Sequence, residues 1–207
     1  MVKHDAVDKA PAIDKSQNIA FIICVFGYFF FVFMLNNQLP LILETLKFNE
    51  ALLGTLIACS GLGNILSGMA SAALGKRYPM QGTLGELIIP GGLTAIGFGI
   101  ISIALLYLRA DIMAISFCCI FLIVGVFSAR FSIATNIFMV KNFSSDIALV
   151  SSRVQAMQNI AILCAPLVGA SILSNYTPVV LFAFAGVFGI VVFILSAISS
   201  RVKPSLY

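Results

Sequence analysis

Charged residues are scarce in this chain of 207 residues. Asp, Glu, Lys and Arg together make up 10% of it, and there is a single histidine, His4. A soluble domain carries about 25% charged residues, so this composition cannot cover a free globular protein with polar surface. Long polar runs are missing as well, which excludes a disordered chain. With 60% hydrophobic residues and a mean hydropathy of +1.08, the sequence predicts an integral membrane protein.

Sequence motifs of enzymes and metal sites are also missing. The chain has no P-loop, no HExxH, no GxSxG and no pair of carboxylates inside an apolar run. Its five cysteines all lie in apolar runs, which argues against a disulfide framework and against a CxxC metal site. The net charge of +4 is dispersed between apolar segments and forms no basic patch. We therefore expect no catalytic residue, no cofactor, no bound metal and no nucleic-acid partner.

Six long apolar stretches predict transmembrane helices, because about 20 residues suffice to cross a hydrocarbon core about 30 Å thick. They cover residues 19–41, 51–74, 87–108, 112–140, 156–173 and 179–198. The short alternating segments typical of an outer-membrane barrel are not found. The predicted fold is thus all-α and embedded in the membrane. It comprises a polar N-terminal tail (1–18), a six-helix transmembrane domain (19–200) and a C-terminal tail (201–207).

The positions of the basic residues predict the orientation of these helices. Nine of the twelve Lys and Arg residues fall in the tails or in loops that six crossings place on one side of the membrane, whereas only Lys47 and Arg109 fall on the other side. Basic residues accumulate in cytoplasmic loops. Both tails are therefore expected in the cytoplasm, as in a multi-pass protein of a bacterial inner membrane.

Glycines recur every seven residues in the second and third predicted spans. One series is Gly54, Gly61, Gly68 and Gly75, and the other is Gly85, Gly92 and Gly99. Seven residues make almost two helical turns, so each series lies along one helix face. Small residues let membrane helices approach closely. We therefore predict that both helices are buried against neighbours along these faces.

Polar side chains inside the spans indicate a polar cavity, because amides and hydroxyls are costly in hydrocarbon and usually face a wet interior. The alternative is structural, since amides also join helices through hydrogen bonds. On the first interpretation, the candidate substrate-binding residues are Asn37, Gln38, Asn64, Arg130, Ser132, Asn136, Gln158 and Asn159.

Arg130, the one charged residue well inside a span, allows two interpretations. If its helix begins at Ile112, Arg130 lies about 27 Å along the axis, near the inner interface, and its side chain can reach the headgroups. If the helix extends to Val140, Arg130 lies only about 6 Å from the midpoint and needs a wet or anionic partner. Arg130 is also expected to point away from Asn136, about 240° around the helix.

Several segments resemble one half of a major facilitator superfamily transporter. The segment 39–68, LPLILETLKFNEALLGTLIACSGLGNILSG, is similar to the first two helices of the C-terminal half in drug- and siderophore-efflux members. The segment 148–161, ALVSSRVQAMQNIA, resembles the loop with a GRV motif before the penultimate helix, with Arg153 as its arginine. The segment 165–170, APLVGA, is similar to a GPxxGG element.

The loop after the second span fits the C-terminal half better than the N-terminal one. The segment 72–81, AALGKRYPMQ, keeps Arg77 and Tyr78 but lacks the acidic residue and the later basic residues of the N-terminal motif. The resemblance implies two inverted three-helix repeats within the six helices. It further implies a second six-helix half, because members of the family enclose their path between two halves.

Together these patterns favour a half-size secondary transporter that exports a small organic or amphipathic molecule. It is expected to act in the lipid bilayer as a homodimer or with a separately encoded partner half. A non-transporting membrane subunit that anchors an export or biosynthetic assembly, and a fragment of a full-length carrier, are the alternatives.

Overall fold

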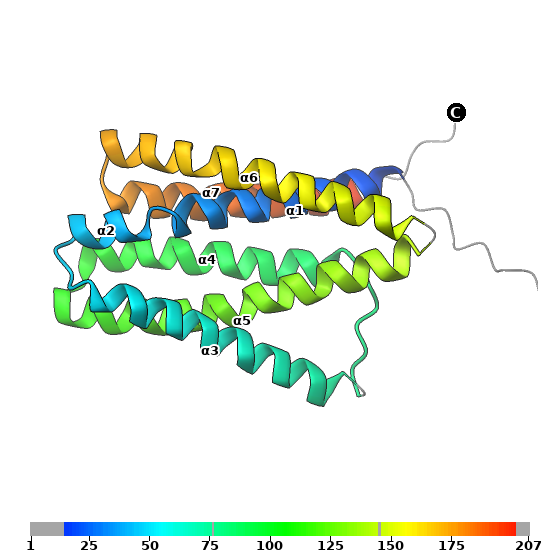
Figure 1. Cartoon of the computed structure of the whole chain (residues 1–207), viewed down its shortest axis with the longest axis horizontal. Helices are drawn as coiled ribbons and strands as arrows, with labels where there is room; N and C mark the ends of the chain where they lie inside the picture. Colours follow the sequence, from blue (N-terminus) through cyan, green and yellow to red (C-terminus); the bar gives the residue numbers. More distant parts are fainter. Residues whose placement is uncertain (1–14, 76, 145, 202–207) are drawn as a thin grey trace, which may run out of the picture.

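The computed structural model describes residues 15–75, 77–144 and 146–201, and within these ranges the chain forms helices and no strand. The helices are α1 (Lys15–Asn36), α2 (Leu39–Thr45), α3 (Ala51–Leu74), α4 (Gly85–Tyr107), α5 (Ala110–Asn142), α6 (Ile147–Asn175) and α7 (Pro178–Arg201) (Figure 1). All but α2 are long and apolar enough to cross a membrane. The predicted all-α fold with six spans is confirmed. Most of the two predicted tails, residues 1–14 and 202–207, lies outside the described residues.

Two helix boundaries differ by five or more residues from those predicted. The stretch 19–41 was expected to be one helix, but α1 ends at Asn36 and the short α2 begins at Leu39. Pro40 occupies the first turn of α2, and proline disfavours helical backbone in the residue before it and lacks an N–H donor. At the other boundary, α6 begins at Ile147, nine residues before the predicted span 156–173. The polar residues there lengthen the helix without lengthening the apolar run.

The helices pack in a pattern that repeats. Helix α4 packs on α7, α1 packs on α6 and α7, and α5 packs on α3 and α4. Exchanging α1 with α5, α3 with α6 and α4 with α7 gives the same neighbours, and α1 and α5 run in opposite directions (Figure 1). The two triplets of spanning helices thus form the inverted repeats found in transporter folds, as the resemblance implied.

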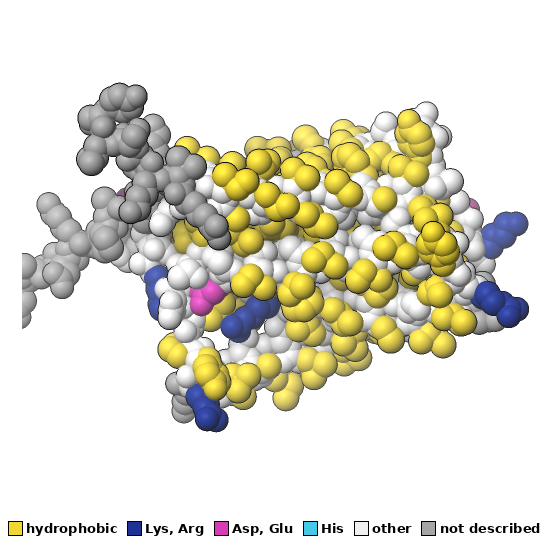
Figure 2. Space-filling model, turned by 180° about the vertical axis from the view of Figure 1, so that it is seen from behind, with side chains coloured by type: hydrophobic (Ala, Val, Ile, Leu, Met, Phe, Trp, Pro, Cys, Tyr) yellow, Lys and Arg dark blue, Asp and Glu magenta, His cyan; other side chains and the backbone are white. Residues whose placement is uncertain are grey.

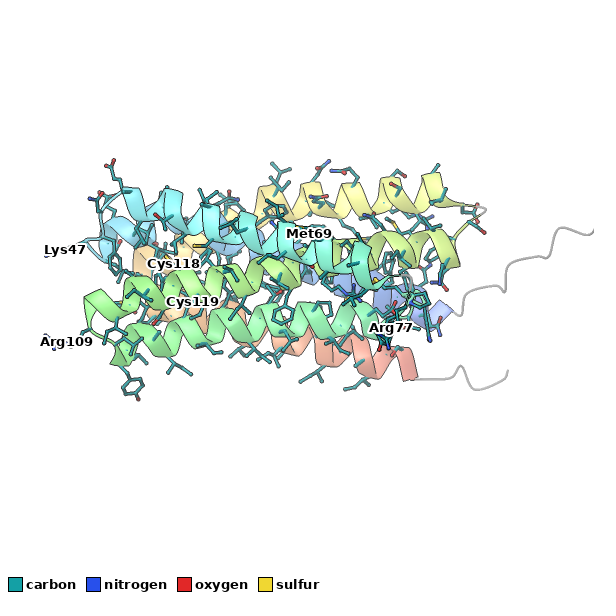
Figure 3. The ribbon with its side chains drawn as sticks, turned by 90° about the horizontal axis from the view of Figure 1, so that it is seen from below. Lys47, Met69, Arg77, Arg109, Cys118 and Cys119 are labelled. Carbon is teal, nitrogen blue, oxygen red and sulfur yellow. The ribbon has the colours of Figure 1, made fainter. Side chains whose placement is uncertain are left out.

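The ends of the bundle carry the loops that the charge pattern separates. Figure 3 places Lys47 and Arg109 at one end and Arg77 at the opposite end. The described ends of α1 and α7 lie at the same end of the bundle (Figure 1). The cytoplasmic location of that end remains a prediction.

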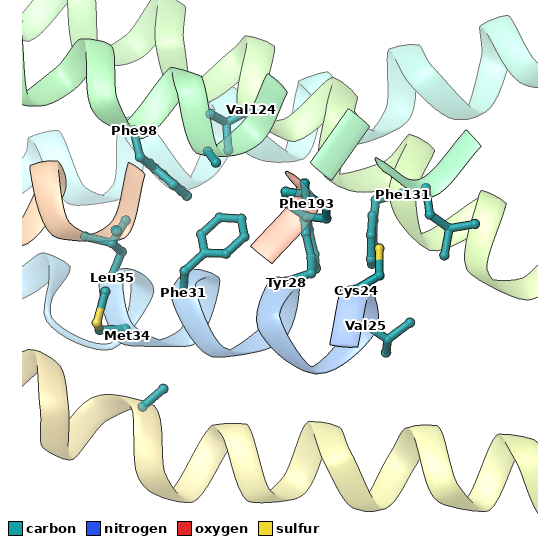
Figure 4. Packing of buried hydrophobic residues seen from close by; sticks show 14 of the residues in the cluster. Cys24, Val25, Tyr28, Phe31, Met34, Leu35, Phe98, Val124, Phe131 and Phe193 are labelled. Atoms are coloured by element: carbon teal, nitrogen blue, oxygen red, sulfur yellow. The ribbon is translucent and has the colours of Figure 1, made fainter. Parts of the chain in front are cut away.

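Aromatic side chains fill the centre of the bundle. The Tyr28 ring stacks on Phe131 of α5 with the ring centroids 3.7 Å apart, and its hydroxyl donates a hydrogen bond to Ser128 Oγ at 2.8 Å. One turn further along α1, Phe31 packs edge-on against Phe98 of α4, 6.0 Å between centroids (Figure 4). Buried aromatic pairs add to packing beyond their area. The middle of these six helices is therefore occupied by side chains.

The glycine series form few of the predicted contacts. A Cβ added at Gly54, Gly61, Gly68 or Gly92 would meet no described atom within 4 Å. The prediction of a buried face is thus wrong for α3, which is mostly exposed. It holds in part for α4, which is more than half buried and whose Gly99 lies against Gly186 of α7. Heptad spacing indicates that the glycines share a face, but it does not tell which face is covered.

Most of the close approaches are made by other glycines. Gly63 of α3 and Gly125 of α5 face each other's helix, and a Cβ on either one would collide with the backbone of the opposite helix, at Leu122 and Ser60 respectively. Between α4 and α7, a Cβ on Gly186 would lie 2.9 Å from the Cα of Gly99. Both helix pairs therefore depend on backbone contact at small residues.

Two cysteines offer a direct test of the α3–α5 packing. The thiols of Cys59 in α3 and Cys118 in α5 are neighbours, and every cysteine described is free. Mild oxidation with copper phenanthroline is expected to join them, because closely approaching cysteines on adjacent helices can reach disulfide geometry. Mass spectrometry of the digested protein would detect the linked peptides. Cys59→Ser should abolish the link, whereas Cys164→Ser should not, and a predominant link from Cys59 to any other cysteine would contradict this packing.

Candidate functional site

An open groove lies between α3 and α5 near the end of the bundle that carries Arg77. It has a volume of about 920 Å³ and is walled by the last two turns of α3, the second half of α5 and the loop between α3 and α4. In Figure 1, α3 diverges from α5 toward this end. Figure 2 shows the surface hollowed there, with Lys or Arg side chains beside hydrophobic ones. Most of the lining is apolar.

Arg130 lies in this groove. Its Nη1 donates a hydrogen bond to Ser71 Oγ of α3 at 3.0 Å, and its side chain is half-buried. Ser71 lies three residues, or about 4.5 Å of helix rise, before the end of α3 at Leu74. Measured along α5, in contrast, Arg130 is only four residues from the helix midpoint. Arg130 thus belongs to the longest described helix of the bundle, and its guanidinium lies at the level of the last turn of α3.

The groove also includes Asn136, which was expected on a different face from Arg130. Both residues line it. Arg130 and Asn136 are six residues apart, which places them about 240° apart around α5, or about 120° by the shorter way. The α5 residues that line the groove cover roughly half of the circumference of the helix. Asn136 occupies one margin of this wide face, so the prediction that the two residues point to separate places is wrong.

Hydrogen bonds fix the loop between α3 and α4, which closes the groove at the end of the bundle that carries Arg77. Lys141 Nζ donates to Met80 O at 2.6 Å, and Asn142 Nδ2 donates to Gly82 O at 2.9 Å. The Glu86 carboxylate in the first turn of α4 accepts from the backbone N–H groups of Gln81 at 2.8 Å and Gly82 at 2.9 Å. Gly82 has φ +73°, a conformation that glycine adopts without strain. The loop is thus fixed to both α4 and α5.

Polar side chains also form one stripe on α5 and another on α6. Ser132 and Asn136 are exposed on α5, one turn apart, and Ser132 is one turn beyond the serine that binds Tyr28. On α6, Asn159 is exposed and accepts a hydrogen bond from Gln155 Nε2 at 3.2 Å, and Gln158 is half-buried. These four predicted residues lie in the half of the bundle nearer the described chain ends.

The remaining predicted residues are elsewhere. Gln38 is buried at the opposite end, where its Nε2 donates to Pro166 O of α6 at 2.9 Å. Asn37 is exposed beside it, just beyond the end of α1. Asn64 is exposed near the middle of α3. Because Ser132 lies 22 residues, about 33 Å, along α5 from the end near Asn37, the structure does not gather the eight predicted residues into one cluster.

Two of the groove residues that form hydrogen bonds were not predicted from the sequence. Ser71 pairs with Arg130, and Lys141 lies at the loop end of the same groove. Lys141 served only as an orientation signal, and Ser71 was not distinguished among the small residues of its helix. The spacing of Ser67 and Ser71 could have indicated them, because two serines one turn apart share a helix face. Both line the groove.

The described residues contain no group of three or more His, Cys, Asp or Glu side chains able to hold a metal ion. The groove and the polar stripes offer hydrogen-bond donors, acceptors, a cation and apolar walls. These groups suit reversible binding of an organic molecule.

Comparison with known proteins identifies the family. The model of the Major Facilitator Superfamily matches residues 17–206. No curated protein and no solved structure matches the chain. Members of this family are in general transporters and not enzymes. The match covers all six spanning helices, whose inverted repeats fit half of such a transporter. The chain therefore belongs to the Major Facilitator Superfamily and is a multi-pass membrane transporter protein.

Proposed function

We propose that the chain is one six-helix half of a secondary carrier that exports a small organic or amphipathic molecule. It works with a second six-helix half, either another copy or a different chain, and the two halves rock about a site between them. The substrate path runs over the face that carries the polar residues of α5 and α6. The end of the bundle that carries the described ends of α1 and α7 faces the cytoplasm of a bacterial cell.

The observation that carries this proposal is the exposure of amide side chains far inside the spans. Asn64 is 13 residues from the start of α3 and 10 from its end, and Asn159 is 12 residues from the start of α6 and 16 from its end. Both are exposed. Lipid tails offer an amide no hydrogen bonds, so water, substrate or another protein surface must meet these side chains in the membrane.

The packed centre and the open flanks support a second half. Tyr28, Phe31 and Phe131 occupy the middle of the bundle, so a substrate path has to lie on its outside. Helices α3 and α6 are mostly exposed, and Figure 3 shows both on the side of the bundle away from α7. Gly54, Gly61 and Gly68 leave a small-residue stripe open on α3, a surface that suits close packing of another membrane helix.

Transport through the polar face is tested by removing its amides. Cells expressing the protein are loaded with ethidium, a cationic amphiphile, or carboxyfluorescein, an anionic one, and dye release is followed by fluorescence. We expect faster release of at least one dye than in cells with an empty vector. Asn136→Ala with Gln158→Ala should slow that release about tenfold, because a lost hydrogen bond to substrate costs about 1–3 kcal/mol.

The control for this experiment is Asn175→Ala. Asn175 is an exposed amide at the far end of α6 that bonds to Ser171 O at 2.8 Å within its own helix, so its loss should leave dye release unchanged. Equal release from the double variant and the wild-type protein would remove both amides from the path. Release no faster than with the empty vector for either dye would contradict export of such amphiphiles.

A further inference from the structure

We propose that the groove between α3 and α5 binds an anionic phospholipid of the inner leaflet, with Arg130 holding the phosphate. Asn136 lies at the margin of both this groove and the proposed substrate path, but Arg130 and the apolar walls of the groove are not assigned to that path. The proposal does not depend on the chain being an exporter.

The charge of the groove selects an anion. Arg130 and Lys141 are the cationic side chains among its lining residues, and none of the described lining residues is acidic. Arg130 donates one hydrogen bond to Ser71, whereas a guanidinium carries five N–H donors. Arginine in a membrane segment usually has an anionic or polar partner, and its planar donors match a phosphate group.

The position of Arg130 suits a headgroup rather than a soluble ion. Its partner Ser71 lies within one turn of the end of α3, and a helix of 24 residues is about 36 Å long, slightly more than the hydrocarbon core. The last turn of α3 therefore lies close to the boundary where lipid phosphates are found. Lys141 lies 11 residues further along α5, at the loop that closes the groove.

The walls of the groove suit an acyl chain. On the side of Arg130 nearer the middle of the membrane, the lining includes Leu66 and Ala70 of α3 and Val126 and Phe127 of α5, with Ser67 as its polar member. The groove therefore offers a partner to both parts of a phospholipid: Arg130 for the phosphate and these apolar residues for an acyl chain. Basic pockets between helices on the cytoplasmic side are known to bind acidic lipid headgroups, and a volume of about 920 Å³ accommodates part of a lipid molecule.

The test measures lipid binding to the whole protein, purified in a neutral detergent and freed of bound lipid. Native mass spectrometry compares phosphatidylglycerol with phosphatidylcholine of the same acyl chains, and inorganic phosphate is added separately. We expect phosphatidylglycerol to bind at least tenfold more tightly than phosphatidylcholine and to raise the temperature of thermal unfolding. Inorganic phosphate alone should do neither, because it lacks the acyl chain.

Three variants separate the charge from the walls. Arg130→Gln should lower phosphatidylglycerol binding about tenfold and bring it near that of phosphatidylcholine. Ala70→Phe should weaken the binding of phosphatidylglycerol as strongly while keeping both cations, because the phenyl ring fills the apolar part of the groove. Arg109→Gln, which removes an exposed arginine at the opposite end of the bundle, should leave the binding unchanged.

Circular dichroism first establishes that each variant is folded. If Arg130→Gln does not fold, Ala70→Phe and Arg130→Lys decide the outcome, with Arg130→Lys expected to retain a preference for phosphatidylglycerol. Equal binding of the two lipids by the wild-type protein would overturn the proposal. So would full binding by Ala70→Phe, or a response to inorganic phosphate as large as that to phosphatidylglycerol, which would indicate an ion site.

Discussion

Replacing Gly125 with leucine is expected to unfold the α3–α5 pair. A Cβ at this position would collide with the carbonyl oxygen of Ser60 and would lie 2.9 Å from its Cα. Backbone cannot move aside as a flexible side chain can, so the two helices must separate. Overpacking of a tight core costs about 1–3 kcal/mol, and a clash of the added Cβ with backbone atoms lies at the upper end of that range or above it. We expect a loss of about 3 kcal/mol or more in the free energy of unfolding.

The matched control is Gly61→Leu in the facing helix. Its added side chain meets no described atom within 4 Å, and leucine favours helix over glycine by up to about 1 kcal/mol. This variant of the single bundle should therefore be as stable as the wild-type protein or slightly more so. Unfolding by urea in detergent, followed by circular dichroism, measures both. Equal stability of Gly125→Leu and Gly61→Leu would contradict the close contact between α3 and α5.

The difference between these two glycines shows what sequence patterns can and cannot predict here. The spanning helices follow directly from long apolar runs, because hydrocarbon permits helices whose backbone groups are all paired. Gly61 and Gly63 are two residues apart, about 200° around α3, and both fit a helix with small residues. Only the position of α5 decides that Gly63 is buried and Gly61 is open, and that position depends on packing far along the chain.

The candidate site, like the fold, was predictable in its residues but not in their packing. The polar residues of α5 and α6 were found because amides stand out against an apolar background, and Asn136 and Gln158 lie where the path is proposed. Gln38 stands out equally, yet its amide joins the start of α2 to Pro166. The groove itself could not be predicted, because it arises where α3 diverges from α5. Ser71 gains its partner from this geometry alone.

Association with a second bundle is expected to be lost when the open glycine stripe of α3 is filled. We expect two differently tagged copies of the chain to purify together in mild detergent. The variant with Gly54→Leu, Gly61→Leu and Gly68→Leu should reduce this joint purification at least tenfold. In membranes, close approach at small residues replaces much of the hydrophobic drive between helices, and three leucines hold the facing helix several ångströms away.

Gly92→Leu provides the control on another helix. A Cβ at Gly92 of α4 also meets no described atom within 4 Å, and α4 packs on α7 and α5. If the second half docks on α3, Gly92→Leu should purify with its partner copy as the wild-type protein does. Equal loss in both variants would indicate a general effect of leucine on detergent behaviour. If the α3 variant still purifies fully with its partner copy, the glycine stripe is not part of the interface. The amide of Asn64 in the middle of the membrane would then have to bond to water or substrate rather than to a protein partner, since lipid tails offer it no hydrogen bond.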